Sequence, residues 1–70
     1  MAFSKGDWVK WRWGNGEGKG EVREVFHQRV ERQIKGSTIV RNADKDDPAY
    51  LVVQDDGDEV LKKDGELQRA

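Results

Sequence analysis

The stretch Lys5–Gly20 reads KGDWVKWRWGNGEGKG and contains all three tryptophans of the chain. Its first half alternates strictly, which in an extended chain places every second side chain on the same face. One face carries Val9, Trp11 and Trp13, and the other carries Trp8, Lys10 and Arg12. Alternation of aromatic and β-branched residues with charged ones is typical of a β-strand. We therefore predict a strand over residues 7–13 that buries Val9 and Trp11 and leaves Trp8 partly exposed.

Glycine follows at every second position from Gly14 to Gly20. Because glycine loses much backbone entropy in regular structure, we predict a mobile loop here. A Walker A motif ending at Gly18-Lys19 would need a glycine where Trp13 stands and a hydroxyl residue where Gly20 stands. The glycines also lack the G-x-G-x-x-G spacing of a dinucleotide-binding turn. The sequence therefore excludes both phosphate-binding motifs.

The composition indicates a small soluble domain with a modest core. The 70 residues are 34% hydrophobic and 39% charged, so we expect one domain over residues 1–70, with residues 1–4 as a loose lead from which Phe3 folds back on the core. There is no cysteine, and the longest apolar run, residues 49–53, is too short to span a membrane. Two acidic clusters, Asp44/Asp46/Asp47 and Asp55/Asp56/Asp58/Glu59, do not complete a calcium-binding loop. We expect a cytoplasmic protein without a cofactor or metal.

Residues 21–35, EVREVFHQRVERQIK, allow two interpretations. The apolar residues fall at helical spacing, which favours an amphipathic helix. The alternative is a strand over residues 20–25, a break near His27, and a second strand paired with residues 37–41 across a Lys35-Gly36 turn. In that pairing Val30, Ile34 and Ile39 share one face. The missing N-cap residue before Glu21 favours strands without deciding the matter.

The C-terminal half predicts a hairpin. Pro48 favours extended geometry at its start, and Tyr50–Val53 is apolar on both faces, as in a covered central strand. Residues 55–58 form a predicted turn with a glycine, and residues 59–62 form the returning strand with Val60 or Leu61 inward. We expect Leu67 to act as a lid or as part of a last short strand.

The chain resembles a bacterial family, the hypervirulence-associated protein TUDOR domain. The resemblance rests on seven blocks and covers almost the whole chain. They are Lys5-Gly6-Asp7-x-Val9-x-Trp11, the glycine stretch ending in Gly20-x-Val22, Ile34-Lys35-Gly36, Arg41-Asn42-Ala43, Asp47-Pro48-Ala49-Tyr50-Leu51-Val52, Gly57-x-x-Val60-Leu61-Lys62 and Glu66-Leu67. It implies an all-β fold, a small SH3-like or Tudor-like barrel of five to six short antiparallel strands, and so favours strands over residues 21–35. The resemblance transfers no known active residue.

We interpret the protein as a non-catalytic binding module. Ser4, Ser37 and Thr38 are the only aliphatic hydroxyls, and the single His27 has no partner at a telling spacing. Tudor-like barrels can hold a methylated ammonium in an aromatic cage by cation–π attraction. The available members for such a protein or peptide site are Trp8, Trp13 and Tyr50, with Asp7 or Asp47 nearby. The competing interpretation places Trp11, Trp13 and Tyr50 in the core.

A nucleic acid is the alternative partner. Residues 1–35 carry eight Lys or Arg against five Asp or Glu, whereas residues 36–70 carry five against nine. This asymmetry can produce a basic face, although most of these charges are explained by solvated strands and turns. The candidate phosphate contacts are Lys10, Arg12, Lys19, Arg23, Arg29 and Arg32, and Trp8 would stack on a base.

Overall fold

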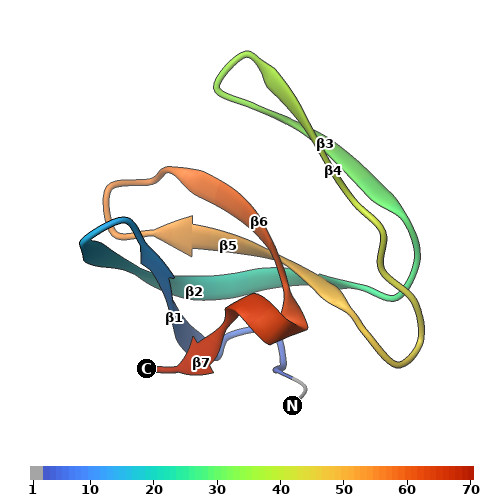
Figure 1. Cartoon of the computed structure of the whole chain (residues 1–70), viewed down its shortest axis with the longest axis horizontal. Coiled ribbons are helices and arrows are strands. Elements are labelled where there is room, and N and C mark those ends of the chain that lie inside the picture. Colours follow the sequence, from blue (N-terminus) through green and yellow to red (C-terminus); the bar gives the residue numbers. More distant parts are fainter. Residues whose placement is uncertain (1–2) are drawn as a thin grey trace.

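The computed structural model describes residues 3–70, which form seven β-strands in two antiparallel sheets (Figure 1). The strands are β1 (Trp8–Trp13), β2 (Gly16–Phe26), β3 (Val30–Ile34), β4 (Ser37–Arg41), β5 (Ala49–Gln54), β6 (Glu59–Lys63) and β7 (Gln68–Arg69). One sheet has the order β6-β5-β2-β1-β7, and the other pairs β3 with β4. The predicted all-β fold is confirmed. The two-residue β7 accounts for one strand more than the predicted five to six.

The glycine-rich segment is mostly strand, so the predicted mobile loop over Gly14–Gly20 is wrong. Only Gly14 and Asn15 form the turn, and β2 begins at Gly16. Trp11 lies opposite Gly18, and a Cβ on that glycine would lie 2.6 Å from Trp11 Nε1. The glycines therefore make room for the neighbouring strand and its indole ring, which offsets their entropy cost in a strand.

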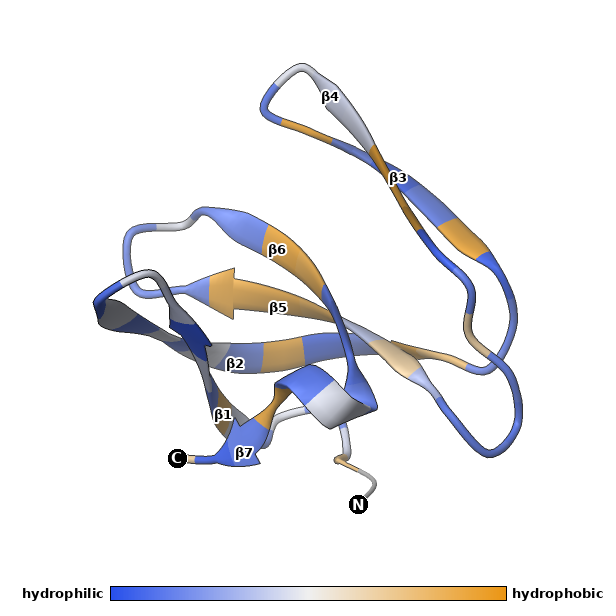
Figure 2. Ribbon diagram, viewed as in Figure 1, coloured by the Kyte–Doolittle hydropathy of each residue, from blue (hydrophilic) through white to orange (hydrophobic). Residues whose placement is uncertain are grey.

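Two apolar clusters lie on opposite faces of β5, which lies between β2 and β6 in the five-stranded sheet. The first cluster contains Phe3, Val9, Trp11, Val22, Tyr50, Val52 and Leu67. The second contains Val30, Ala49, Leu51 and Leu61, with Phe26, Ile34, Ile39 and Ala43 packed against it. Because β5 is covered on both sides, its run of apolar residues has no solvent face, as predicted (Figure 2).

Strand β2 reaches both clusters because it contains an irregularity. Its register against β5 shifts between Val22 and Glu24, leaving Arg23 as the extra residue of a β-bulge. A bulge bends its strand and increases the local twist. Val22 is fully buried in the first cluster, whereas Phe26 packs against the second. The helix interpretation of residues 21–35 is thereby overturned.

The β3–β4 hairpin forms as the strand interpretation predicts. Lys35 and Gly36 have φ values of 51° and 78°, and two consecutive residues with positive φ are characteristic of a type I′ turn. The register pairs Ile34 with Ser37, Arg32 with Ile39 and Val30 with Arg41. Val30, Ile34 and Ile39 consequently share the face that packs on the second cluster. The hairpin forms its own two-stranded sheet beside the five-stranded one, and its inner face packs against Leu61 of β6 without strand pairing (Figure 1).

Both ends of the described chain close the first cluster. Phe3 and Leu67 are buried, and the short 3₁₀-helix η1 (Asp64–Glu66) precedes Leu67 and β7. Residues 1–2 of the predicted loose lead lie outside the described residues. Phe3 folds back on the core as predicted, and Ser4 is not loose. Ser4 N–H donates to Asp7 Oδ2 at 2.8 Å, and Phe3 packs in the core.

Gly57, with a φ of 89°, forms the predicted β5–β6 turn.

Candidate functional site

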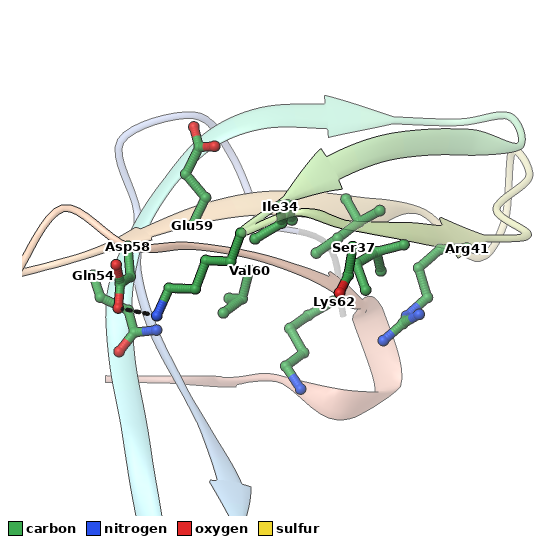
Figure 3. Close-up of a pocket in the computed structure, with 11 residues that line it drawn as sticks. Ile34, Ser37, Arg41, Gln54, Asp58, Glu59, Val60 and Lys62 are labelled. Atoms are coloured by element: carbon green, nitrogen blue, oxygen red, sulfur yellow. Dashed lines mark hydrogen bonds and ion pairs between the residues drawn. The ribbon is translucent and has the colours of Figure 1, made fainter.

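An open groove of about 330 Å³ lies between the β3–β4 hairpin and β6 (Figure 3). We call it the β4–β6 groove. Its hairpin side is formed by Ile34, Lys35, Ser37, Ile39 and Arg41, and its other side by Gln54, Asp58, Glu59, Val60, Leu61 and Lys62. This volume is at the lower end of the range for ligand pockets. The groove combines apolar side chains in its middle with charged ones at its ends.

The groove runs along the edge of β6 and not over one of its faces. Five consecutive residues, 58–62, line it, and consecutive strand residues point to opposite faces. From the hairpin, in contrast, β4 contributes only Ser37, Ile39 and Arg41, which share one face. One face of the hairpin therefore overhangs the free edge of the larger sheet.

The backbone of β6 presents unpaired groups to this groove. Gln54 N–H donates to Asp58 O, and Asp64 N–H donates to Pro48 O, which sets the alternation of the β5–β6 ladder. In an antiparallel pair only every second residue bonds across the ladder, so the N–H and C=O of Glu59 and Leu61 point away from β5. Because β6 is an edge strand, these groups have no partner strand among the described residues.

The two ends of the groove differ in charge. At one end Lys35 Nζ contacts Asp58 Oδ2 at 2.6 Å, and this hydrogen bond and the charge of Asp58 raise the pKa of Lys35. At the other end Arg41 Nε and Lys62 Nζ each lie 3.7 Å from the same carboxylate, that of Glu66. Figure 3 shows Arg41 and Lys62 on one side and Asp58 on the other. Two cations that share one carboxylate leave the Arg41 end with excess positive charge.

The structure does not assemble the predicted aromatic cage. Tyr50 has 0% exposed surface, whereas Trp8 and Trp13 are 44% and 63% exposed. The two tryptophans stand at opposite ends of β1, roughly 16 Å apart at the rise of a strand. Asp47 is exposed and contacts Lys63 Nζ at 2.6 Å. The core interpretation is therefore correct for Trp11 and Tyr50 and wrong for Trp13, which lies at the strand end beyond the core.

Tyr50 has a structural role in the core. Its hydroxyl accepts a hydrogen bond from Phe3 N–H and donates one to Asp64 Oδ1, both at 2.9 Å. Burial raises the pKa of Tyr50; the Phe3 hydrogen bond lowers it, and the neighbouring Asp64 raises it further. With its ring and hydroxyl both occupied, Tyr50 has no surface left for a ligand.

The six predicted cations divide into two groups. Arg23, Arg29 and Arg32 form ion pairs with Glu21, Glu31 and Glu24. Lys10, Arg12 and Lys19 form no ion pair with any residue in the range 3–70, and all three lie on the β1–β2 hairpin. Lys10 stands directly opposite Lys19 in the register, two residues from Trp8. The basic surface predicted from the whole N-terminal half thus narrows to one face of one hairpin.

The predictions from sequence missed the groove. The sequence predicts Ile34 and Ile39 on one hairpin face and Val60 or Leu61 inward, but it does not predict that these two strands face each other across a groove. One signal was available: a two-stranded hairpin cannot cover its own apolar face and must share it with another sheet, which leaves room for an open seam. His27 and the three hydroxyl residues are all exposed, and none of them lines the groove except Ser37.

In the described part of the chain there is no helix of the length and apolarity needed to cross a membrane.

Three comparisons with known proteins were informative to different degrees. No curated protein and no solved structure matches the chain. The profile of the hypervirulence associated proteins TUDOR domain matches residues 6–67 of the 70. Since this match spans nearly all of the strands described above, the chain belongs to the hypervirulence associated proteins TUDOR domain family.

Proposed function

We propose that this protein binds an extended segment of another protein in the β4–β6 groove. The family supports a small binding module. The observation that carries the proposal is the groove itself, where Ile34, Ile39 and Val60 line an opening between two sheets that no strand pairing joins. Apolar side chains with a few polar groups around them are the usual composition of a peptide site. The protein acts by binding and not by catalysis.

A matched pair of substitutions tests this site. Ser37 is exposed and lines the groove, whereas the adjacent Thr38 is exposed and points to the opposite face of β4. Peptides are selected from a random-peptide phage display library on the wild-type protein and are then titrated against Ser37→Trp and Thr38→Trp. Neither change removes core atoms, and tryptophan is well tolerated in strands.

We expect Ser37→Trp to weaken binding of the selected peptides by about tenfold or more, because the indole fills the groove, and Thr38→Trp to leave it nearly unchanged. Peptides that bind both variants as tightly as the wild type would refute the groove as the site. A library from which the wild-type protein selects nothing would refute peptide binding altogether. Circular dichroism of both variants verifies that they are folded.

A second function, binding of single-stranded nucleic acid, is favoured by the Lys10–Lys19 pair. Like charges directly opposite on two strands destabilise a hairpin, and an anionic ligand bound to this face would relieve the repulsion between Lys10 and Lys19. Trp8, 44% exposed and on the same face, would stack on a base. Titration with a single-stranded oligonucleotide at low and moderate salt tests this: binding should weaken steeply with salt. Absence of binding at low salt would contradict it.

A further inference from the structure

We infer that the bound segment pairs with the free edge of β6 as an added antiparallel or parallel strand, and that it directs an acidic side chain to Arg41 and Lys62. This inference rests on the proposed function and specifies how the peptide is held and which peptides are selected. The partner is therefore an extended, acidic and apolar segment of a second protein. Three features of the groove support it independently.

The first feature is the unpaired backbone of Leu61. Leu61 is only 2% exposed, yet its N–H and C=O point away from β5 and have no partner in the part of the chain that the structure describes. Backbone polar groups in such a position are nearly always paired in folded proteins. A peptide strand beside β6 would supply the missing hydrogen bonds at Leu61 and Glu59, which is the mode of β-augmentation.

The second feature is the limited length of the free edge. Lys63 N–H, the next group on this edge, already donates to Glu66 Oε1 at 2.9 Å. The turn that contains Asp58 precedes the edge, where Asp58 O accepts from Gln54 N–H. The added strand is thus confined to the stretch opposite Glu59–Leu61, a segment of roughly three to five residues. Its alternate side chains would face Ile34 and Ile39 beneath the hairpin.

The third feature is the charge at the Arg41 end. Among residues 3–70, Glu66 is the carboxylate that pairs with both Arg41 and Lys62, and one of its oxygens also accepts the Lys63 N–H. Both ion-pair distances are 3.7 Å, longer than the roughly 2.7–2.9 Å of a charge-assisted hydrogen bond. The side chains of Arg41 and Lys62 are 32% and 21% exposed, so their surroundings are partly desolvated. An acidic side chain from the peptide would complete the charge balance.

Two measurements on the selected peptides test this inference. In the first, each peptide is resynthesised with single N-methyl groups at successive positions and with its C-terminus amidated. N-methylation removes one donor without changing the side chain. We expect binding to fall by about tenfold at alternate positions only, because an edge strand bonds every second residue. Uniform tolerance of N-methylation would overturn the strand pairing.

In the second measurement, the acidic residue of the peptide is replaced by its amide, and the protein carries Arg41→Gln or Lys62→Gln. We expect the wild-type protein to lose about tenfold in affinity for the amide peptide, and the two variants to discriminate the peptides far less. Arg23→Gln, which removes an ion-paired cation of β2 outside the groove, is the control and should keep full discrimination. Selected peptides without a consistent acidic residue would overturn this part.

The outcomes separate this inference from the proposed function. If Ser37→Trp abolishes peptide binding but neither N-methylation nor replacement of the acidic residue by its amide changes the affinity, the groove is the site and the strand pairing is wrong. If Ser37→Trp has no effect on peptide binding, the groove is not the site, and both the proposed function and the strand pairing are refuted. If the protein instead binds a second copy of itself through β6, sedimentation will show a dimer that Ser37→Trp disrupts, and the acidic peptide partner is refuted.

Discussion

Phe3 and Tyr50 contact each other through both backbone and ring. The Tyr50 hydroxyl accepts the Phe3 N–H at 2.9 Å, and the two rings meet edge to face with centroids 5.6 Å apart. Forty-seven residues separate them in the sequence. This contact joins the N-terminal segment to strand β5 and covers one end of the first apolar cluster.

Tyr50→Phe should lower the stability of the fold. The change keeps the ring but leaves the buried Phe3 N–H without its acceptor, which costs about 2 kcal/mol and lowers Tm by roughly 10 °C. Thermal unfolding followed by circular dichroism measures this. Thr38→Val, which removes a hydroxyl from an exposed strand position, is the control and should leave Tm almost unchanged.

The raised pKa of Tyr50 predicts a loss of stability in alkali. Below the ordinary tyrosine pKa of 10.0 the proton is bound in both states, and its contribution to stability is complete. Above that pH the unfolded chain releases the proton while the folded protein retains it, so stability falls until the pH passes the folded pKa. Urea denaturation above and below pH 10.0 should show this slope in the wild type and a flatter one in Tyr50→Phe.

Because Tyr50 is the only tyrosine, the ultraviolet absorbance of tyrosinate follows its titration directly. We expect the midpoint in the folded protein to lie above that of the urea-unfolded chain. Equal midpoints in the two states would contradict the burial argument.

Alanine substitutions at Gly16 and Gly20 of β2 should distinguish the steric effect of an added Cβ from the loss of glycine's backbone entropy. A Cβ at Gly20 would lie 2.6 Å from the backbone oxygen of Val53, whereas one at Gly16 would meet Trp13 at an ordinary 3.7 Å. Gly20→Ala should therefore cost about 1–3 kcal/mol, and Gly16→Ala less than about 0.5 kcal/mol. Chemical denaturation measures both. Equal effects would indicate that the entropy of glycine, and not the close approach of strands, decides the outcome.

Trp8 and Trp11 should respond differently to truncation. Trp11 is 5% exposed and packs in the first cluster, so Trp11→Ala should cost about 3–5 kcal/mol, enough to unfold a domain of this size. Trp8 is 44% exposed, and Trp8→Ala should cost less than about 1 kcal/mol. Thermal melts compare the two variants. A collapsed fold in Trp8→Ala would place Trp8 in the core and remove it as a ligand contact.

Lys19→Glu should raise stability while weakening any nucleic-acid binding. The change converts the Lys10–Lys19 repulsion into an attraction worth about 0.2–1 kcal/mol. It also removes one of the three cations without an ion pair on this hairpin. Lys45→Glu, in the exposed connection before β5, alters the net charge equally and serves as the control. If both variants bind an oligonucleotide equally well, the β1–β2 face is not the binding surface.

Local patterns in the sequence were sufficient for β1, β5 and β6. Period-two alternation located β1, and an apolar run followed by a glycine turn located the β5–β6 hairpin, because both depend on neighbouring residues alone. The Lys35-Gly36 turn belonged to one of two interpretations that local patterns left open. Residues 21–35 could not be assigned from periodicity, since spaced apolar residues suit either a helix or a bulged strand. There the resemblance to the family decided correctly for strands.

The glycines show why other features depend on tertiary structure. Taken alone, glycine at alternate positions predicts a loop, because nothing local compensates for its entropy. In the fold, Trp11 occupies the space over Gly18 and Val53 the space beside Gly20, so the same residues are required in a strand. The compensating contact comes from Val53, a residue 33 positions beyond Gly20.

The sequence by itself determined the inward face of β1 and the covered strand β5, and together with the family resemblance it determined the all-β fold. Only the tertiary structure decided which aromatic residues are exposed to a ligand and where a groove opens. The Tyr50 hydroxyl is hydrogen-bonded to Phe3 and Asp64, and the β4–β6 groove exists because a two-stranded hairpin meets a sheet edge without pairing to it. Both outcomes follow from contacts between distant segments, which local alternation and propensity do not encode.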